Sequence, residues 1–175
     1  MKKHKATKRT SIIDKQDDIS RVILNMARKR KQTIYGARSI KAQNNMFGRE
    51  TQDYDVFDKN PKQVANLIQK ELDQAIGHDY FYHKEAKHKG TWKVKGRGVD
   101  MRKNTEDDES IADYSKPDGK VPFVLINGIR YRVLKKELER KRAVAKDPEY
   151  KFRHEKDRDD INRIKGFIKI KKLLR

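Results

Sequence analysis

The chain has 175 residues, and its 45 Lys and Arg against 26 Asp and Glu give a formal net charge of +19. A positive field of this size favours nucleic acid as a partner over a membrane surface. The absence of cysteine excludes disulfides, thiolate zinc sites and a cysteine nucleophile. Since the sequence has neither a bilayer-spanning apolar run nor a signal-peptide core, we expect an intracellular protein of the cytoplasm or nucleus, or a virion component, and not a secreted one.

The first half of the chain predicts helices alternating with strands, because helical apolar spacing and short β-type runs follow one another. In chain order, the expected elements are a flexible basic tail (1–11), a helix (12–31), a strand (33–36), a short helix (37–43), a strand (52–57) and an amphipathic helix that begins at Asn60 and Pro61.

The second half predicts further strands and then charged helices. In chain order, the expected elements are a strand (79–90), a hairpin turning at Gly96–Gly98 (91–101), a flexible acidic loop (103–120), a strand pair joined by an Asn-Gly turn (121–134) and helices (135–175). The predicted fold class is therefore α+β, with a small mixed sheet flanked by helices in a core of residues 12–134 and a helical C-terminal region, residues 135–175.

Two aspartates, Asp53 and Asp55, lie one residue apart in an otherwise apolar strand. Residues two apart on a strand point to the same face, so both carboxylates are expected together, with Tyr54 and Val56 packed behind them. Two carboxylates this close repel each other unless a cation lies between them, and rigidly held oxygen ligands suit Mg²⁺ or Mn²⁺. The alternative is a solvated edge strand that carries two acids.

The segment from Gly36 to Ser39 lies at the expected strand-to-helix junction upstream of this pair. A glycine there permits close backbone approach, and the free N–H groups at a helix N-terminus favour phosphate, although one glycine before a helix is usually structural. Asp100, in the second arm of the expected hairpin, supplies a third carboxylate, and its alternative role is that of an exposed turn residue. Trp92, beside Lys93 and Lys95, is a candidate for stacking on a nucleobase.

These motifs resemble the DNA polymerase β-like nucleotidyltransferase superfamily, whose pattern is a small-residue pair opening a helix, two acids on the next strand and a third acid on a later strand. The matching segments are YGARSI (35–40), DYDV (53–56) and GVDM (98–101). The C-terminal part looks like the helical motif of minimal, abortive-infection-type toxin nucleotidyltransferases, and the matching residues there are Lys141, Arg153, Lys156, Asp157 and Asp160.

The resemblance implies transfer of NMP from an NTP to an acceptor. The positive charge favours an RNA 3′ end as that acceptor, and DNA, a protein or a small molecule are the alternatives. The resemblance also implies Mg²⁺ or Mn²⁺ ions held by Asp53, Asp55 and Asp100. The residues it implies for nucleotide binding are Gly36, Ala37, Arg38, Ser39, Lys141 and Lys156. Ala37 occupies the position of a second Gly or Ser in the pattern, so the alternative is a non-catalytic nucleic-acid-binding protein, perhaps of a virion, that keeps the fold.

Overall fold

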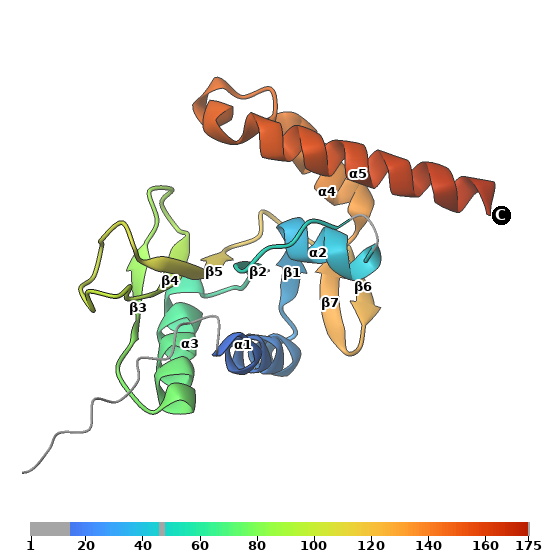
Figure 1. Ribbon diagram of the computed structural model, residues 1–175. Coiled ribbons are helices and arrows are strands. Elements are labelled where there is room, and N and C mark those ends of the chain that lie inside the picture. Colours follow the sequence, from blue (N-terminus) through green and yellow to red (C-terminus); the bar gives the residue numbers. More distant parts are fainter. Residues whose placement is uncertain (1–14, 46–47, 175) are drawn as a thin grey trace, which may run out of the picture.

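The computed structural model describes residues 15–45 and 48–174, and these form a seven-stranded mixed sheet with helices on both faces (Figure 1). The helices are α1 (Gln16–Arg30), α2 (Gly36–Gln43), α3 (Pro61–Ile76), α4 (Leu134–Val144) and α5 (His154–Leu173), with a 3₁₀ segment, η2 (Pro148–Arg153), before α5. The strands are β1 (Thr33–Tyr35), β2 (Tyr54–Phe57), β3 (Phe81–Glu85), β4 (Trp92–Gly96), β5 (Glu109–Ser115), β6 (Phe123–Ile126) and β7 (Ile129–Arg132). The α+β class is confirmed.

The strand order across the sheet is β3-β4-β5-β2-β1-β7-β6. The pairs β1–β7 and β2–β5 are parallel, and the other neighbouring pairs are antiparallel. This order places β2, which carries the two predicted acids, at the centre of the sheet between β1 and β5. The edge-strand alternative for this segment is therefore wrong.

The main core lies between the sheet and the helix pair α1 and α3, which cover one face (Figure 1). Apolar residues of α3 at helical spacing, such as Val64, Ile68 and Leu72, are completely buried there. Burying each such side chain contributes about 1.5–3 kcal/mol to the free energy of folding. On the opposite face lie α2, α4 and α5, and a smaller apolar cluster joins Ile40 to α4 and α5.

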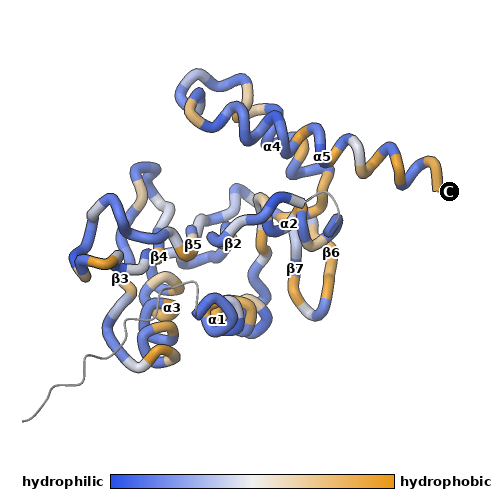
Figure 2. The backbone as a smooth tube through the Cα atoms, viewed as in Figure 1, coloured by the Kyte–Doolittle hydropathy of each residue, from blue (hydrophilic) through white to orange (hydrophobic). Residues whose placement is uncertain are grey.

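The C-terminal region is helical, as predicted, and α4 and most of α5 are hydrophilic along their length (Figure 2). None of the helices in the described part of the chain combines the length and apolarity that crossing a membrane requires. The tail predicted for residues 1–11 lies outside the described residues.

Two predictions for residues 91–120 are wrong. The expected hairpin is the single strand β4 followed by an exposed turn that contains Asp100. The expected acidic loop contains β5, in which Ile111, Ala112 and Tyr114 are buried against the core. Because β5 lies between β2 and β4 in the sheet, these two strands satisfy its backbone hydrogen bonds, and the acidic side chain of Asp108 just before it is buried at 3.8 Å from Lys95.

Candidate active site

A group of carboxylates lies on the sheet face opposite α1 and α3. Tyr54 and Val56 of β2 are buried in the main core, so the alternation of side chains turns Asp53 and Asp55 to the other face. Asp55 pairs in register with Asp113 of the parallel strand β5. Because Ala112 and Tyr114 point into the core, the Asp113 carboxylate lies on the same face as Asp55.

Asp113 takes the position that the sequence analysis gave to Asp100. The Asp100 side chain accepts a hydrogen bond from the backbone N–H of Arg102 at 2.8 Å within an exposed turn, and no contact joins it to the carboxylate pair. The Lys93 ammonium donates a hydrogen bond of 2.7 Å to Oδ2 of Asp113, while the buried Oδ1 has no hydrogen-bond partner among the described residues. The prediction for Asp100 is therefore wrong.

Asp55 has an unusual protonation equilibrium. Burial first, and nearby carboxylates second, raise the pKa of its carboxyl to about 6, against the opposing charge of Arg140. These carboxylates are those of Asp53, Asp113 and Glu137. Negative charge is therefore concentrated here, and a bound cation would relieve it.

Gly36 brings the backbone of the β1–α2 junction against this group. Its φ is +72°, and a Cβ at this position would lie 2.2 Å from Oδ2 of Asp55. Only glycine combines this backbone conformation with this approach. The junction motif and the acid pair, both predicted from the sequence, are therefore in direct contact.

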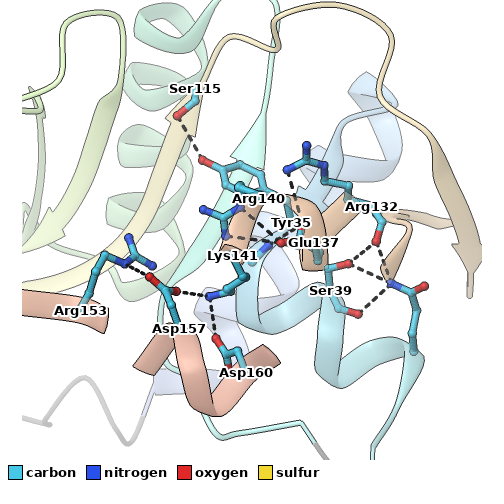
Figure 3. A network of polar contacts seen from close by, with 12 residues as sticks. Tyr35, Ser39, Ser115, Arg132, Glu137, Arg140, Lys141, Arg153, Asp157 and Asp160 are labelled. Atoms are coloured by element: carbon cyan, nitrogen blue, oxygen red, sulfur yellow. Dashed lines mark hydrogen bonds and ion pairs between the residues drawn. The ribbon is translucent and has the colours of Figure 1, made fainter. Parts of the chain in front are cut away.

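The N–H group of Gly36 is occupied by a side chain from α4. It donates a hydrogen bond of 3.1 Å to Oε1 of Glu137, which is fully buried. The guanidinium groups of Arg140 and Arg132 lie 3.4 and 3.9 Å from the same carboxylate (Figure 3). A backbone N–H and two arginines surround one carboxylate, which is the chemistry of an anion site.

Arg140 interacts electrostatically with Asp55 as well as with Glu137, so the anion site and the aspartates share this cation. Its guanidinium lies 5.3 Å from the ring centroid of Tyr35. Burial alone would lower the pKa of Arg140, but the charges of Glu137 and Asp55 raise it, so the group is a permanent cation. Sequence reasoning missed both Arg140 and Glu137, because α4 has charges on every face.

Arg38, another residue predicted at the junction, contacts the backbone of the segment that carries Asp53. It donates hydrogen bonds to the backbone oxygens of Gln52 and Asp53 at 2.9 and 3.2 Å and lies over the Tyr54 ring at 3.9 Å. Arg38 therefore fixes the start of β2. It also lines an open groove of about 690 Å³ beside Asp53, which is large enough for a substrate.

Ala37 and Ser39 are buried within the fold. The Ser39 hydroxyl donates a hydrogen bond of 2.6 Å to the backbone oxygen of Arg132 and thereby ties α2 to β7 (Figure 3). The prediction that Ser39 contacts phosphate is therefore wrong, because its hydroxyl is enclosed and already engaged.

Lys141 is also buried and engaged. Its side chain is 1% exposed, and its ammonium lies 2.9 Å from Asp157 and 2.6 Å from Asp160 (Figure 3). The prediction of a phosphate contact is wrong, and Lys141 instead joins α4 to α5. Arg49 reaches the same cluster at 3.2 Å from Asp160, which ties the segment before β2 to α5.

Lys156, the remaining predicted nucleotide contact, lies exposed on α5 between residues of the buried ion cluster. Its neighbours Arg153 and Asp157 form an ion pair at 3.0 Å. The C-terminal motif thus forms a structural brace, and the structure shows no contact between Lys156 and the carboxylate group.

The carboxylates have the right chemistry for a hard divalent cation, and the unpartnered Oδ1 of Asp113 is a free oxygen ligand. As they stand, no three His, Cys, Asp or Glu side chains in the described ranges converge closely enough to form a ready metal site. The ion pair between Lys93 and Asp113 occupies one oxygen of the group. Binding a cation would therefore require these side chains to move and the ion pair between Lys93 and Asp113 to open.

No protein-family model and no curated protein matches this sequence. The solved structure of the Megavirus polyadenylate synthase aligns with 91% of this chain and 32% of its own, at 18% identity and a TM-score of 0.69. That of JHP933 from Helicobacter pylori aligns with 87% of this chain and 65% of its own, at 12% identity and a TM-score of 0.52. The chain thus spans about a third of the Megavirus synthase. At these identities the likeness concerns the fold, and this protein has a nucleotidyltransferase-like fold.

Proposed function

We propose that the protein is a metal-dependent nucleotidyltransferase that transfers NMP from an NTP to an acceptor, with an RNA 3′ end favoured over DNA. The observation that carries the proposal is the alignment of Asp55 with Asp113 on parallel strands, with Gly36 packed directly against Asp55. A glycine at a strand-to-helix junction, in contact with Asp55 and the carboxylates around it, is suited to holding a phosphate and a cation next to each other.

Each residue has a role in this proposal. Asp53, Asp55 and Asp113 would hold Mg²⁺ or Mn²⁺, which when bound supplies charge neutralisation and lowers the pKa of an acceptor hydroxyl. The N–H of Gly36 and the guanidinium of Arg140 would receive phosphate oxygens at the position that Glu137 now occupies, with Arg132 beside them.

The acceptor is inferred from charge. The net charge of +19 supports a polyanionic acceptor. The groove of about 690 Å³ beside Asp53 provides space for the end of a strand. The name of the Megavirus protein, a polyadenylate synthase, is consistent with RNA.

A second candidate function is nucleic-acid binding without catalysis. It is favoured by the two contacts that occupy the site, that of Glu137 on the Gly36 N–H and that of Lys93 on Asp113. In such a protein these contacts would be permanent, and neither nucleotide nor metal would displace them.

The deciding experiment is incorporation of each labelled NTP into a mixed single-stranded RNA pool with Mg²⁺ or Mn²⁺. We expect incorporation by the wild type, its loss in Asp53→Asn/Asp55→Asn and in Asp113→Asn, and normal rates in the matched control Asp100→Asn. Equal losses in the two single variants would overturn the assignment of Asp113. Absence of incorporation from the wild type, with tight RNA binding retained, would favour the second candidate.

A further inference from the structure

Trp92 forms part of a second groove, on the face of the sheet opposite the carboxylates. Trp92 pairs with Tyr114, which is buried under α3, whereas the next residue, Lys93, pairs with Asp113. The alternation along β4 therefore sends Trp92 to the α3 face and Lys93 to the carboxylate face. The groove has a volume of about 880 Å³ and lies between the start of α3 and the strands β3 and β4.

The floor of this groove is aromatic and firmly held. Trp92 packs against the core and is only partly buried, so part of the indole lines the groove. The His83 ring lies 5.7 Å from it, and His83 Nδ1 donates a hydrogen bond of 2.6 Å to Oε1 of Gln69. Burial lowers the pKa of His83, and nearby lysines including Lys62 lower it further, so the imidazole is neutral at pH 7. Two neutral rings in fixed positions suit the flat face of a base.

The rim of the groove is cationic. Lys59, Lys62 and Lys116 are exposed at its edge, and no Asp or Glu is among the residues that line it. The Lys62 ammonium lies 5.1 Å from the centroid of the Trp92 ring, which is within the range of a cation–π contact. Positive charge is therefore held directly beside the aromatic surface.

We propose that this groove binds a segment of single-stranded nucleic acid, with one base stacked on Trp92 and the adjoining phosphates on Lys59, Lys62 and Lys116. An aromatic platform with a cationic rim is the arrangement by which proteins hold single strands without reading their sequence. A duplex keeps its bases stacked on each other and cannot offer one to the indole. The site uses none of the carboxylates, so it goes beyond the proposed transfer reaction and does not depend on it.

The test uses Trp92 as its own probe, since it is the single tryptophan in the chain. Its fluorescence is followed while the full-length protein is titrated with a 20-residue oligouridylate, and binding is measured in parallel by anisotropy of the labelled strand. We expect saturable quenching by the single strand, and much weaker quenching by a duplex of the same length or by UMP. An unchanged emission at saturation would overturn the proposal, and equal quenching by UMP would reassign the groove to mononucleotides.

Variants separate the ring from the charges. Trp92→Ala should weaken binding about 5- to 150-fold, the range measured for one stacked base, whereas Trp92→Phe should lose less because it keeps a ring. Trp92 also packs against the core, so the rim variant Lys59→Ala/Lys62→Ala/Lys116→Ala tests the site without touching the core. It should lower the salt dependence of log K by about 2, at about 0.7 for each phosphate on a single strand.

A matched control removes the same charge elsewhere. The variant Lys165→Ala/Lys169→Ala/Lys172→Ala loses three exposed lysines of α5. If it weakens binding as much as the rim variant does, the effect comes from net charge and the proposal is wrong. Failure of this site is distinguishable from failure of the proposed function, because Asp53→Asn/Asp55→Asn should abolish transfer and leave the quenching intact.

Discussion

Replacing Asp55 by asparagine should make the metal-free protein more stable while abolishing transfer. Burial, together with the charges of Asp53, Asp113 and Glu137, raises the pKa of this carboxyl to about 6, while Arg140 opposes the shift. The ionised form is therefore disfavoured in the folded protein relative to the unfolded chain. Asparagine has nearly the same shape and carries no charge to disfavour.

The size and sign of the effect follow from linkage. The folded pKa of about 6 lies about 2 units above the unfolded value of about 3.9, which corresponds to about 3 kcal/mol. Because the folded pKa is raised, the favourable contribution of protonated Asp55 is complete below about pH 4 and is lost as the pH rises through about 6. The stability gap between Asp55→Asn and the wild type should therefore be near zero at pH 4 and about 3 kcal/mol above pH 7.

Urea unfolding between pH 4 and pH 8 in the presence of EDTA measures this gap. For a chain of this size about 3 kcal/mol corresponds to roughly 6–12 °C in Tm, well within the reach of calorimetry. The exposed Asp100→Asn should track the wild type throughout. Mg²⁺ should raise the Tm of the wild type and leave that of Asp55→Asn unchanged, because a ligand stabilises only the state that binds it. A gap that is absent at pH 8, or that does not change with pH, would refute the reasoning.

Two further predictions concern the buried charges of α4. Lys141→Met should destabilise the fold by about 3–5 kcal/mol, since it leaves the carboxylates of Asp157 and Asp160 buried without their cation. Urea unfolding measures this loss, and the triple variant Lys141→Met/Asp157→Leu/Asp160→Leu should recover most of it. If Lys141→Met alone is as stable as the wild type, the buried ion cluster is contradicted. Glu137→Gln should lower KM for the NTP about fivefold, equivalent to about 1 kcal/mol, because it removes the charge that competes with phosphate for the start of α2. Steady-state kinetics beside the exposed control Glu139→Gln measures this, and an unchanged or higher KM would count against displacement of Glu137 by nucleotide.

The junction glycine and the acid pair could be predicted because each is a local pattern. Gly36 separates a β-type run from a helical one, and Asp53 and Asp55 alternate with apolar residues. The third acid could not be predicted in the same way. Asp113 lies on β5, whose acidic and Pro/Gly-containing flanks suggest a loop. It lies beside Asp55 because β2 and β5 are adjacent and parallel in the sheet, although a helix and two strands separate them in the sequence. The available signal was the alternation of the apolar residues Ala112 and Tyr114 with Asp113.

The charged helices show a second limit of sequence reasoning. Lys141 and Glu137 look like any other charges of α4, yet they are 1% and 0% exposed. Their burial is set by how α4 packs on α2 and α5, and the helix's own pattern does not encode it. Lys156, which the sequence treats like Lys141, is exposed on α5. A charge pattern thus predicts a helix without indicating which of its charges become structural.

The ionised carboxylate of Asp55 lowers both the stability of the fold and its affinity for a polyanion, which favours the proposed transfer reaction over nucleic-acid binding without catalysis. This carboxylate opposes folding, because burial and three other acids raise its pKa to about 6. It also repels a polyanion, so it would weaken nucleic-acid binding by a chain whose net charge of +19 otherwise favours it. A divalent cation placed between Asp55 and Asp113 would neutralise both carboxylates and so remove both penalties at once, beside Gly36. Metal-dependent phosphate chemistry is therefore a use of Asp55 that offsets its cost both to stability and to binding.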